Sequence, residues 1–65
     1  MKFLRKLRTE QGIPQGELAQ KVGISQAQLC LIEYGKYRPK AATIIKIARI
    51  LQCDPSALLT DWEEE

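Results

Sequence analysis

Glycine and proline divide this chain into five short segments, and this division constrains the fold more than any other feature. The breaks fall at Gly12-Ile13-Pro14, Gly23, Gly35, Arg38-Pro39 and Asp54-Pro55. Each segment repeats its apolar residues at intervals of three and four, which predicts helices rather than strands. Five short helices joined by tight turns can bury their apolar faces only against one another. The pattern therefore predicts an all-α, compact five-helix domain.

The expected helices cover residues 2–11, 14–22, 25–35 and 41–52, with a fifth, short helix that is capped by Asp54. The fourth segment has the clearest period, because its apolar residues fall at i, i+3, i+4 and i+7. The residues expected to face inward along the chain are Phe3, Leu4, Leu7, Leu18, Ala19, Val22, Leu29, Ile32, Ile44, Ile47, Ala48, Leu51 and Leu58. Ser25-Gln26-Ala27-Gln28 also fits a capping box at the start of the third helix.

The composition limits the function as well as the fold. The chain of 65 residues is 45% apolar and 28% charged, which is typical of a folded globular domain. It contains no histidine, the commonest general base and metal ligand. We therefore expect no enzyme, no cofactor and no metal site. No apolar run approaches the roughly 18 residues of a membrane span, and the charged start is not a secretion signal, so we expect a cytoplasmic protein.

The two cysteines, Cys30 and Cys53, have no CxxC spacing and no histidine companion. A zinc site needs more ligands than this chain offers. A disulfide is typical of exported domains, and no other feature indicates export. We expect both cysteines to be small, buried or half-buried apolar side chains.

Charge is segregated along the chain. Residues 1–52 contain all ten Lys and Arg residues and three glutamates, a formal charge of +7, whereas residues 53–65 contain five acidic residues and no basic one, a charge of −5. A basic body is expected where one surface meets a polyanion, although a solvated surface with a solubilising tail has the same pattern. We predict a folded domain over residues 1–60 and an acidic C-terminal tail over residues 61–65.

The second and third expected helices are joined by only a few residues around Gly23, so they must meet at a steep angle. The crossing needs a small side chain, which Ala19 supplies, and a turn residue that tolerates positive φ, which Gly23 supplies. Apolar anchors on both helices then leave the start of the third helix projecting from the core. A helix presented in this way can enter the major groove of DNA.

These two segments contain a specific combination of residues: Gln15-Gly16-Glu17-Leu18-Ala19-Gln20-Lys21-Val22-Gly23-Ile24-Ser25-Gln26, followed by Leu29, Ile32, Glu33 and Gly35-Lys36. The combination resembles the Cro/repressor-type, or XRE-like, helix-turn-helix regulators, and the resemblance extends from the first helix to Leu59. It implies a lambda-repressor-like fold with the helix-turn-helix at helices 2 and 3. It also implies a bacterial or phage transcription regulator, associated with the nucleoid, that binds near-palindromic operator DNA as a homodimer.

The resemblance implies roles for individual residues. Gln15 is expected to bond a DNA phosphate and to brace the recognition helix, and Arg8 and Glu33 to form a partly buried salt bridge between the first and third helices. The start of the recognition helix is expected to reach base edges, where a glutamine can bond adenine N6 and N7 together. The loop that follows is expected to track the DNA backbone. The predicted DNA contacts are Gln15, Ser25, Gln26, Ala27, Gln28, Leu31, Tyr34, Lys36, Arg38 and Lys40.

Several of these residues have a second interpretation. Gln28 could serve only as the partner of Ser25 in the capping box. Cys30 and Leu31 make this helix unusually apolar, so they either read thymine methyl groups or contact a protein. The predicted dimer contacts are Ile45, Ile50, Leu59 and Trp62, although Trp62 could instead cap the core.

We therefore expect a sequence-specific double-stranded DNA-binding regulator that represses by occupying its operator as a homodimer. The alternative is a protein-interaction module on the same fold, such as an antitoxin or an accessory docking domain. The basic body and the pair Gln15 and Gln26 favour DNA. The Cys30-Leu31 pair and the acidic tail favour a protein partner.

Overall fold

The backbone turns at each of the breaks that glycine and proline mark in the sequence. The computed structural model describes residues 1–63, and for residues 62 and 63 the helical backbone alone. The elements are α1 (Lys2–Glu10), α2 (Gln15–Val22), α3 (Gln26–Glu33), α4 (Ala41–Leu51) and α5 (Pro55–Glu63). The described residues contain no strand, so the all-α prediction is confirmed. None of these helices has the length and apolar character that crossing a membrane requires.

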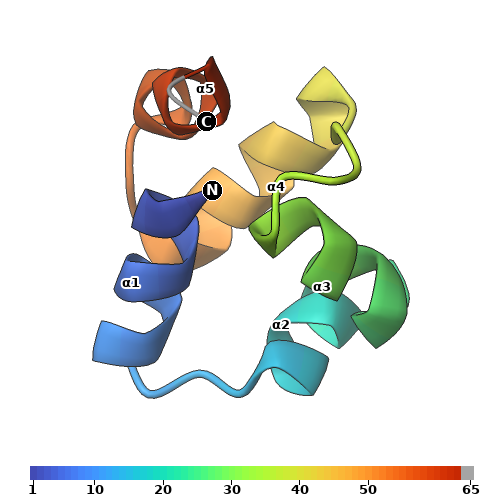
Figure 1. Ribbon diagram of the computed structural model, residues 1–65. Coiled ribbons are helices and arrows are strands. Elements are labelled where there is room, and N and C mark those ends of the chain that lie inside the picture. The colour runs from blue at the N-terminus through green and yellow to red at the C-terminus, as the bar shows by residue number, and fades with distance from the viewer. Residues whose placement is uncertain (64–65) are drawn as a thin grey trace.

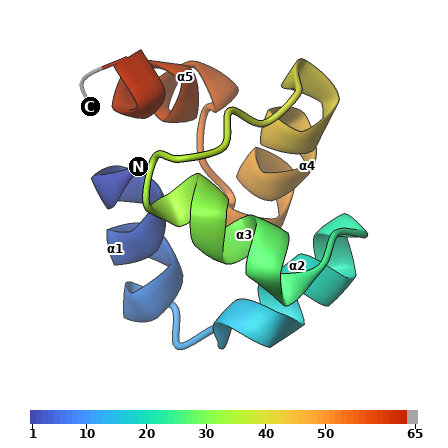
Figure 2. The same ribbon diagram turned by 45° about the vertical axis from the view of Figure 1, so that its right-hand side comes forward.

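The helices form one rounded bundle in which the first and last helices, α1 and α5, lie side by side. α1 packs against α5, α5 against α4, and α4 against α2 (Figure 1). α3 packs on α2 and also contacts α1, with its long side open to the viewer in Figure 2. The radius of gyration of the Cα atoms is 10.2 Å, close to the value of about 11 Å for a folded chain of this length.

One apolar core joins all five helices, and its buried members are Met1, Leu4, Leu18, Ala19, Val22, Leu29, Ile32, Ile44, Ile47, Ala48, Leu51 and Leu58. The prediction for α1 is wrong at Phe3, whose side chain is 39% exposed. α1 instead turns Met1, Leu4 and Arg8 toward the centre, a spacing of three and four residues on one helical face.

The corner between α2 and α3 has the predicted geometry. Gly23 adopts the left-handed conformation, with φ of 88° and ψ of 29°. The N–H of Ile24 donates to the carbonyl oxygen of Ala19 at 3.0 Å, and the N–H of Gly23 donates to that of Gln20 at 3.2 Å, which closes the helix end. Ala19 is buried at the crossing. This short corner holds α3 across α2.

α5 continues past residue 60, so the predicted boundary between domain and tail falls inside a helix. Asp61 is buried, and its two carboxylate oxygens accept hydrogen bonds from the backbone N–H groups of Phe3 and Leu4, both at 3.0 Å. Met1, the N-cap of α1, makes no capping bond with its side chain. Asp61 therefore caps α1 from the other end of the chain and belongs to the folded domain. Residues 64–65 lie outside the described residues.

Candidate nucleic-acid interface

α3 has one face in the core and one in solvent. Leu29 and Ile32 have no exposed surface, because they pack among the apolar side chains of the other helices. The opposite side and the first turn carry the residues that the sequence predicted for base contact. The exposed ones are Ser25, Gln26, Ala27 and Leu31, while Gln28 is half-buried.

The first turn of α3 is fixed by its cap. The Oγ of Ser25 accepts a hydrogen bond from the backbone N–H of Gln28 at 3.0 Å, which confirms the serine half of the predicted capping box. Within the described residues, the hydrogen bonds include none from the side chain of Gln28 back to Ser25. The amide of Gln28 is therefore available to another partner.

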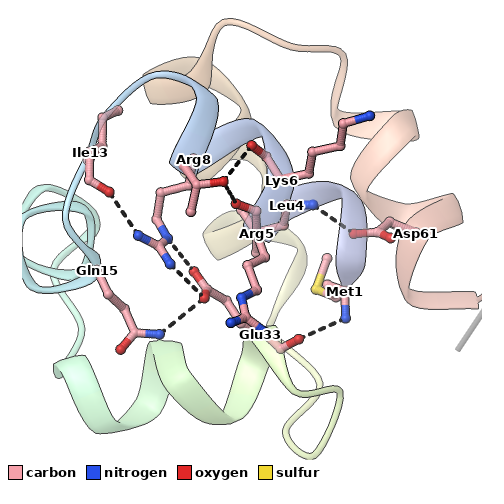
Figure 3. Close-up of polar contacts among 10 residues, drawn as sticks. Met1, Leu4, Arg5, Lys6, Arg8, Ile13, Gln15, Glu33 and Asp61 are labelled. Carbon is pink, nitrogen blue, oxygen red and sulfur yellow. Dashed lines mark hydrogen bonds and ion pairs between the residues drawn. The ribbon is translucent and has the colours of Figure 1, made fainter.

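A buried polar cluster behind this face ties three helices together (Figure 3). The guanidinium of Arg8 donates to both carboxylate oxygens of Glu33, at 2.7 and 3.1 Å, and to the carbonyl oxygen of Ile13 at 2.8 Å. The side-chain N–H of Gln15 donates to the Oε1 of Glu33 at 3.1 Å. The amino group of Met1 donates to the Glu33 carbonyl oxygen at 3.0 Å. Glu33 thus links the end of α3 to α1 and to the start of α2.

The loop between α3 and α4, which leaves the C-terminal end of α3, carries three exposed basic side chains, Lys36, Arg38 and Lys40. Its chain reverses at once, because the N–H of Lys36 donates to the carbonyl oxygen of Leu31 at 2.9 Å. Buried Pro39 anchors the loop, and the exposed residues around it are Tyr34, Lys36, Tyr37, Arg38 and Lys40. Among the described residues, the ion pairs involve none of the three basic side chains. Their charges face solvent and are available to an anionic partner.

The structure separates the two residues that the sequence suggested as one apolar patch. Cys30 is half-buried and lines an open hollow of about 250 Å³, together with Arg5, Arg8, Gln15, Glu33 and Tyr34. Leu31 is 45% exposed and is not part of this hollow. Cys53 is also half-buried, and both thiols are free, which confirms the prediction for the cysteines. Burial and, to a smaller extent, the neighbouring Asp54 raise the pKa of the Cys53 thiol.

Asp54 begins α5, as the sequence predicted. Its carboxylate accepts hydrogen bonds from the backbone N–H of Ser56 at 2.9 Å and from the Ser56 hydroxyl at 2.8 Å. These two bonds stabilise the charged form and lower the pKa of Asp54.

The predicted dimer contacts do not share one environment. Ile45 and Leu59 are exposed, at 41% and 45%, whereas Ile50 is partly buried and packs against the core. Trp62 lies on α5, but its side chain falls outside the described part of the structure. One exposed aromatic residue near α5 had no predicted role at the surface: Phe3 lines a second open hollow, of about 370 Å³, with residues of α5.

The fold and the open face of α3 define a helix-turn-helix domain. The helix-turn-helix family model matches residues 4–58, which include all of α2, α3 and α4. The chain belongs to the helix-turn-helix family, and it is of the XRE type that its motif resembles.

Similar proteins include both regulators and an enzyme. An uncharacterized HTH-type transcriptional regulator of Archaeoglobus fulgidus is 36% identical over 62 residues, covering 95% of this chain and 89% of the regulator. One of Methanothermobacter thermautotrophicus is 38% identical over 49 residues, covering 75% and 71%. The type II methyltransferase M.Sau96I of Staphylococcus aureus is 31% identical over 63 residues, or 97% of this chain but 15% of the enzyme. The likeness to the methyltransferase therefore concerns one small segment of it.

Proposed function

We propose that this chain is a sequence-specific double-stranded DNA-binding transcription regulator and that α3 reads the major groove. The observation that carries the proposal is the two-sided character of α3. Leu29 and Ile32 hold one side in the core, while Gln26, Ala27 and Gln28 form an open first turn. A helix fixed in this way can lie in the groove without leaving the domain. Its glutamine amides are suited to adenine, which offers a donor and an acceptor side by side.

The neighbouring loop supplies the affinity in this proposal. Lys36, Arg38 and Lys40 are exposed directly after α3, where the backbone of a bound duplex would pass. Contacts between basic side chains and DNA phosphates release counterions, so the binding affinity falls steeply as the salt concentration rises. Gln15 uses one side-chain N–H on Glu33 and keeps its amide oxygen and second N–H for a further partner. A phosphate contact from Gln15 is compatible with its role in bracing α3.

We propose further that the chain regulates transcription by occupying its operator. In this proposal the chain catalyses no reaction and acts by occupancy, as a homodimer that covers a near-palindromic operator and represses transcription in the cytoplasm. The names of the two archaeal relatives support a role in transcription. Exposed Ile45 and Leu59 are available for contact between two copies.

Selection from a random duplex pool at physiological salt tests the proposal. We expect enrichment of two inverted half-sites whose centres lie about 34 Å apart, one helical turn of DNA. Gln26→Ala should then weaken binding to the selected site more than binding to a scrambled duplex, whereas the matched variant Gln20→Ala on α2 should change neither. A pool that is retained only at low salt, with no enriched sequence, contradicts the proposal.

A second candidate function is docking of a protein on α3. The observation that favours it is the exposure of two large side chains on one end of this helix, Leu31 at 45% and Tyr34 at 65%. Exposed apolar and aromatic side chains are typical anchors at protein interfaces. The selection separates the two functions, because a docking surface enriches no DNA sequence.

A further inference from the structure

The first turn of α2 lacks the usual side-chain cap. Its N-cap is Pro14, which makes no capping bond with its side chain, and the acidic side chain of that turn is Glu17. Gly16 follows one residue into the helix. It has an ordinary helical φ rather than a positive one, so the backbone conformation does not require glycine there.

The side chain of Gln26 occupies the space beside Gly16. A Cβ atom placed on Gly16 would lie 3.1 Å from the Oε1 of Gln26 and 3.5 Å from its Cδ. The first distance is shorter than an ordinary van der Waals contact, so a methyl group at residue 16 would push the Gln26 amide away by a few tenths of an ångström. The carbonyl oxygen of Gln26 thus rests against the first turn of α2, where a partial negative charge is favoured.

Glycine inside a helix is unfavourable compared with alanine. At residue 16, this lower helix propensity is offset, because the missing side chain of glycine leaves room for the amide of Gln26. A glutamine reads adenine with both its oxygen and its nitrogen, so the orientation of the amide before binding determines which base edge it fits.

We propose that Gly16 is a positioning residue that sets the base preference of Gln26. It rests on the proposed function, since base preference has meaning only for a DNA-binding α3. Gly16 itself makes no contact with a base in this scheme. Its missing side chain leaves room for the Gln26 amide beside the first turn of α2 in the free protein.

The test is the variant Gly16→Ala, measured with and without DNA. In the free protein, alanine should raise the urea midpoint of unfolding, because it is the better helix former. The side-chain amide resonances of Gln26 should nevertheless shift, and their nuclear Overhauser contact with residue 16 should weaken. On the duplex selected by the wild-type protein, the ratio of specific to non-specific affinity should fall by roughly 3- to 10-fold, the effect of a partly misplaced base contact.

A double-mutant cycle makes the assignment specific. In a Gln26→Ala background, Gly16→Ala should leave the affinity ratio unchanged, because no amide remains to be positioned. An equal loss in both backgrounds, or no loss with Gln26 present, overturns the positioning role. If the wild-type protein selects no sequence at all, the proposed function fails and the specificity role fails with it. In that case the resonances of Gln26 still show whether Gly16 holds the amide.

Discussion

Arg8 of α1 and Glu33 of α3 form a buried ion pair with two hydrogen bonds, of 2.7 and 3.1 Å. The two residues are far apart in the sequence, and all of α2 lies between them. Their side chains are 11% and 3% exposed. Removing two charges from water is unfavourable, and it is balanced only when each charge meets its partner in good geometry. Gln15 and the carbonyl oxygen of Ile13 complete the hydrogen bonding of the pair. The pair therefore fixes the position of the candidate reading helix relative to α1 and α2.

Glu33→Ala should destabilise the domain by about 3–5 kcal/mol, because it leaves the Arg8 guanidinium buried without its counter-charge. Urea unfolding followed by far-UV circular dichroism measures the loss. The matched control is Glu17→Ala, which breaks the exposed pair of Glu17 and Lys21 at 4.0 Å and should cost less than about 0.5 kcal/mol. Similar losses for the two variants would contradict the structural role assigned to the buried pair.

Asp61→Ala should lower the stability by about 0.5–2 kcal/mol, the usual effect of removing a helix cap. The variant leaves the N–H groups of Phe3 and Leu4 without the carboxylate that accepts from them. Asp61→Asn should lower the stability less than Asp61→Ala does, since one amide oxygen remains as an acceptor. Thr60→Ala, at the exposed neighbouring position, should stay within about 0.5 kcal/mol of the wild type. If Asp61→Ala is as mild as Thr60→Ala, Asp61 does not cap α1.

Gln52→Gly should stabilise the protein by up to about 1 kcal/mol. Gln52 ends α4 in the left-handed conformation, with φ of 58°, and among the described residues it is the non-glycine residue with positive φ. Glycine adopts this conformation without the steric cost. The relief of that strain in the folded protein outweighs the destabilising effect of glycine's greater freedom in the unfolded chain. Gln20→Gly, in the exposed middle of α2, should have the opposite sign and cost about 1 kcal/mol. Thermal unfolding of both variants gives the comparison, and a destabilised Gln52→Gly would refute the prediction.

The carboxyl group of Asp54 should titrate below the ordinary value for aspartate. The backbone N–H and the hydroxyl of Ser56 lower its pKa in the folded state, so it stabilises the fold above the unfolded pKa of about 3.9. That contribution is lost as the pH falls through the lower, folded-state pKa. NMR titration of the carboxyl carbon measures the midpoint. Ser56→Ala keeps the backbone bond and removes the hydroxyl bond, so it should move the midpoint part of the way back. A midpoint at the ordinary value would contradict both hydrogen bonds.

The positions of the helices were predictable because they depend on local chemistry. Gly23 predicts the end of α2, and the structure ends α2 there. The apolar period of the fourth segment predicts a helix, and the structure has α4 there. Both signals lie within a few residues of the feature that they predict. The ion pair of Arg8 and Glu33 was accessible only through the resemblance to known regulators. No local pattern marks two charged residues so far apart as partners.

The remaining features depend on how the helices pack. Phe3 and Met1 both offer an apolar side chain to the core, and the rotation of α1 against α5 decides that Met1 is buried and Phe3 exposed. Asp61 stands in an acidic run, which predicts exposure to solvent. α5 instead brings it to the first turn of α1, where it accepts hydrogen bonds from the backbone. The contact between Gln26 and Gly16 depends on a side-chain rotamer across the helix corner. Sequence alone determines neither the rotation of a helix nor that rotamer.

The most direct test of whether α3 reads DNA is an NMR titration of the ¹⁵N-labelled chain with the selected duplex, beside a scrambled duplex as control. We expect the largest shift changes at the amides of residues 25–31 and 36–40, with smaller changes for the scrambled duplex. The helices α1 and α5, which carry none of the predicted DNA contacts, should change little. Shift changes centred on α1 and α5, or equal changes with both duplexes, would contradict the central claim that α3 reads DNA.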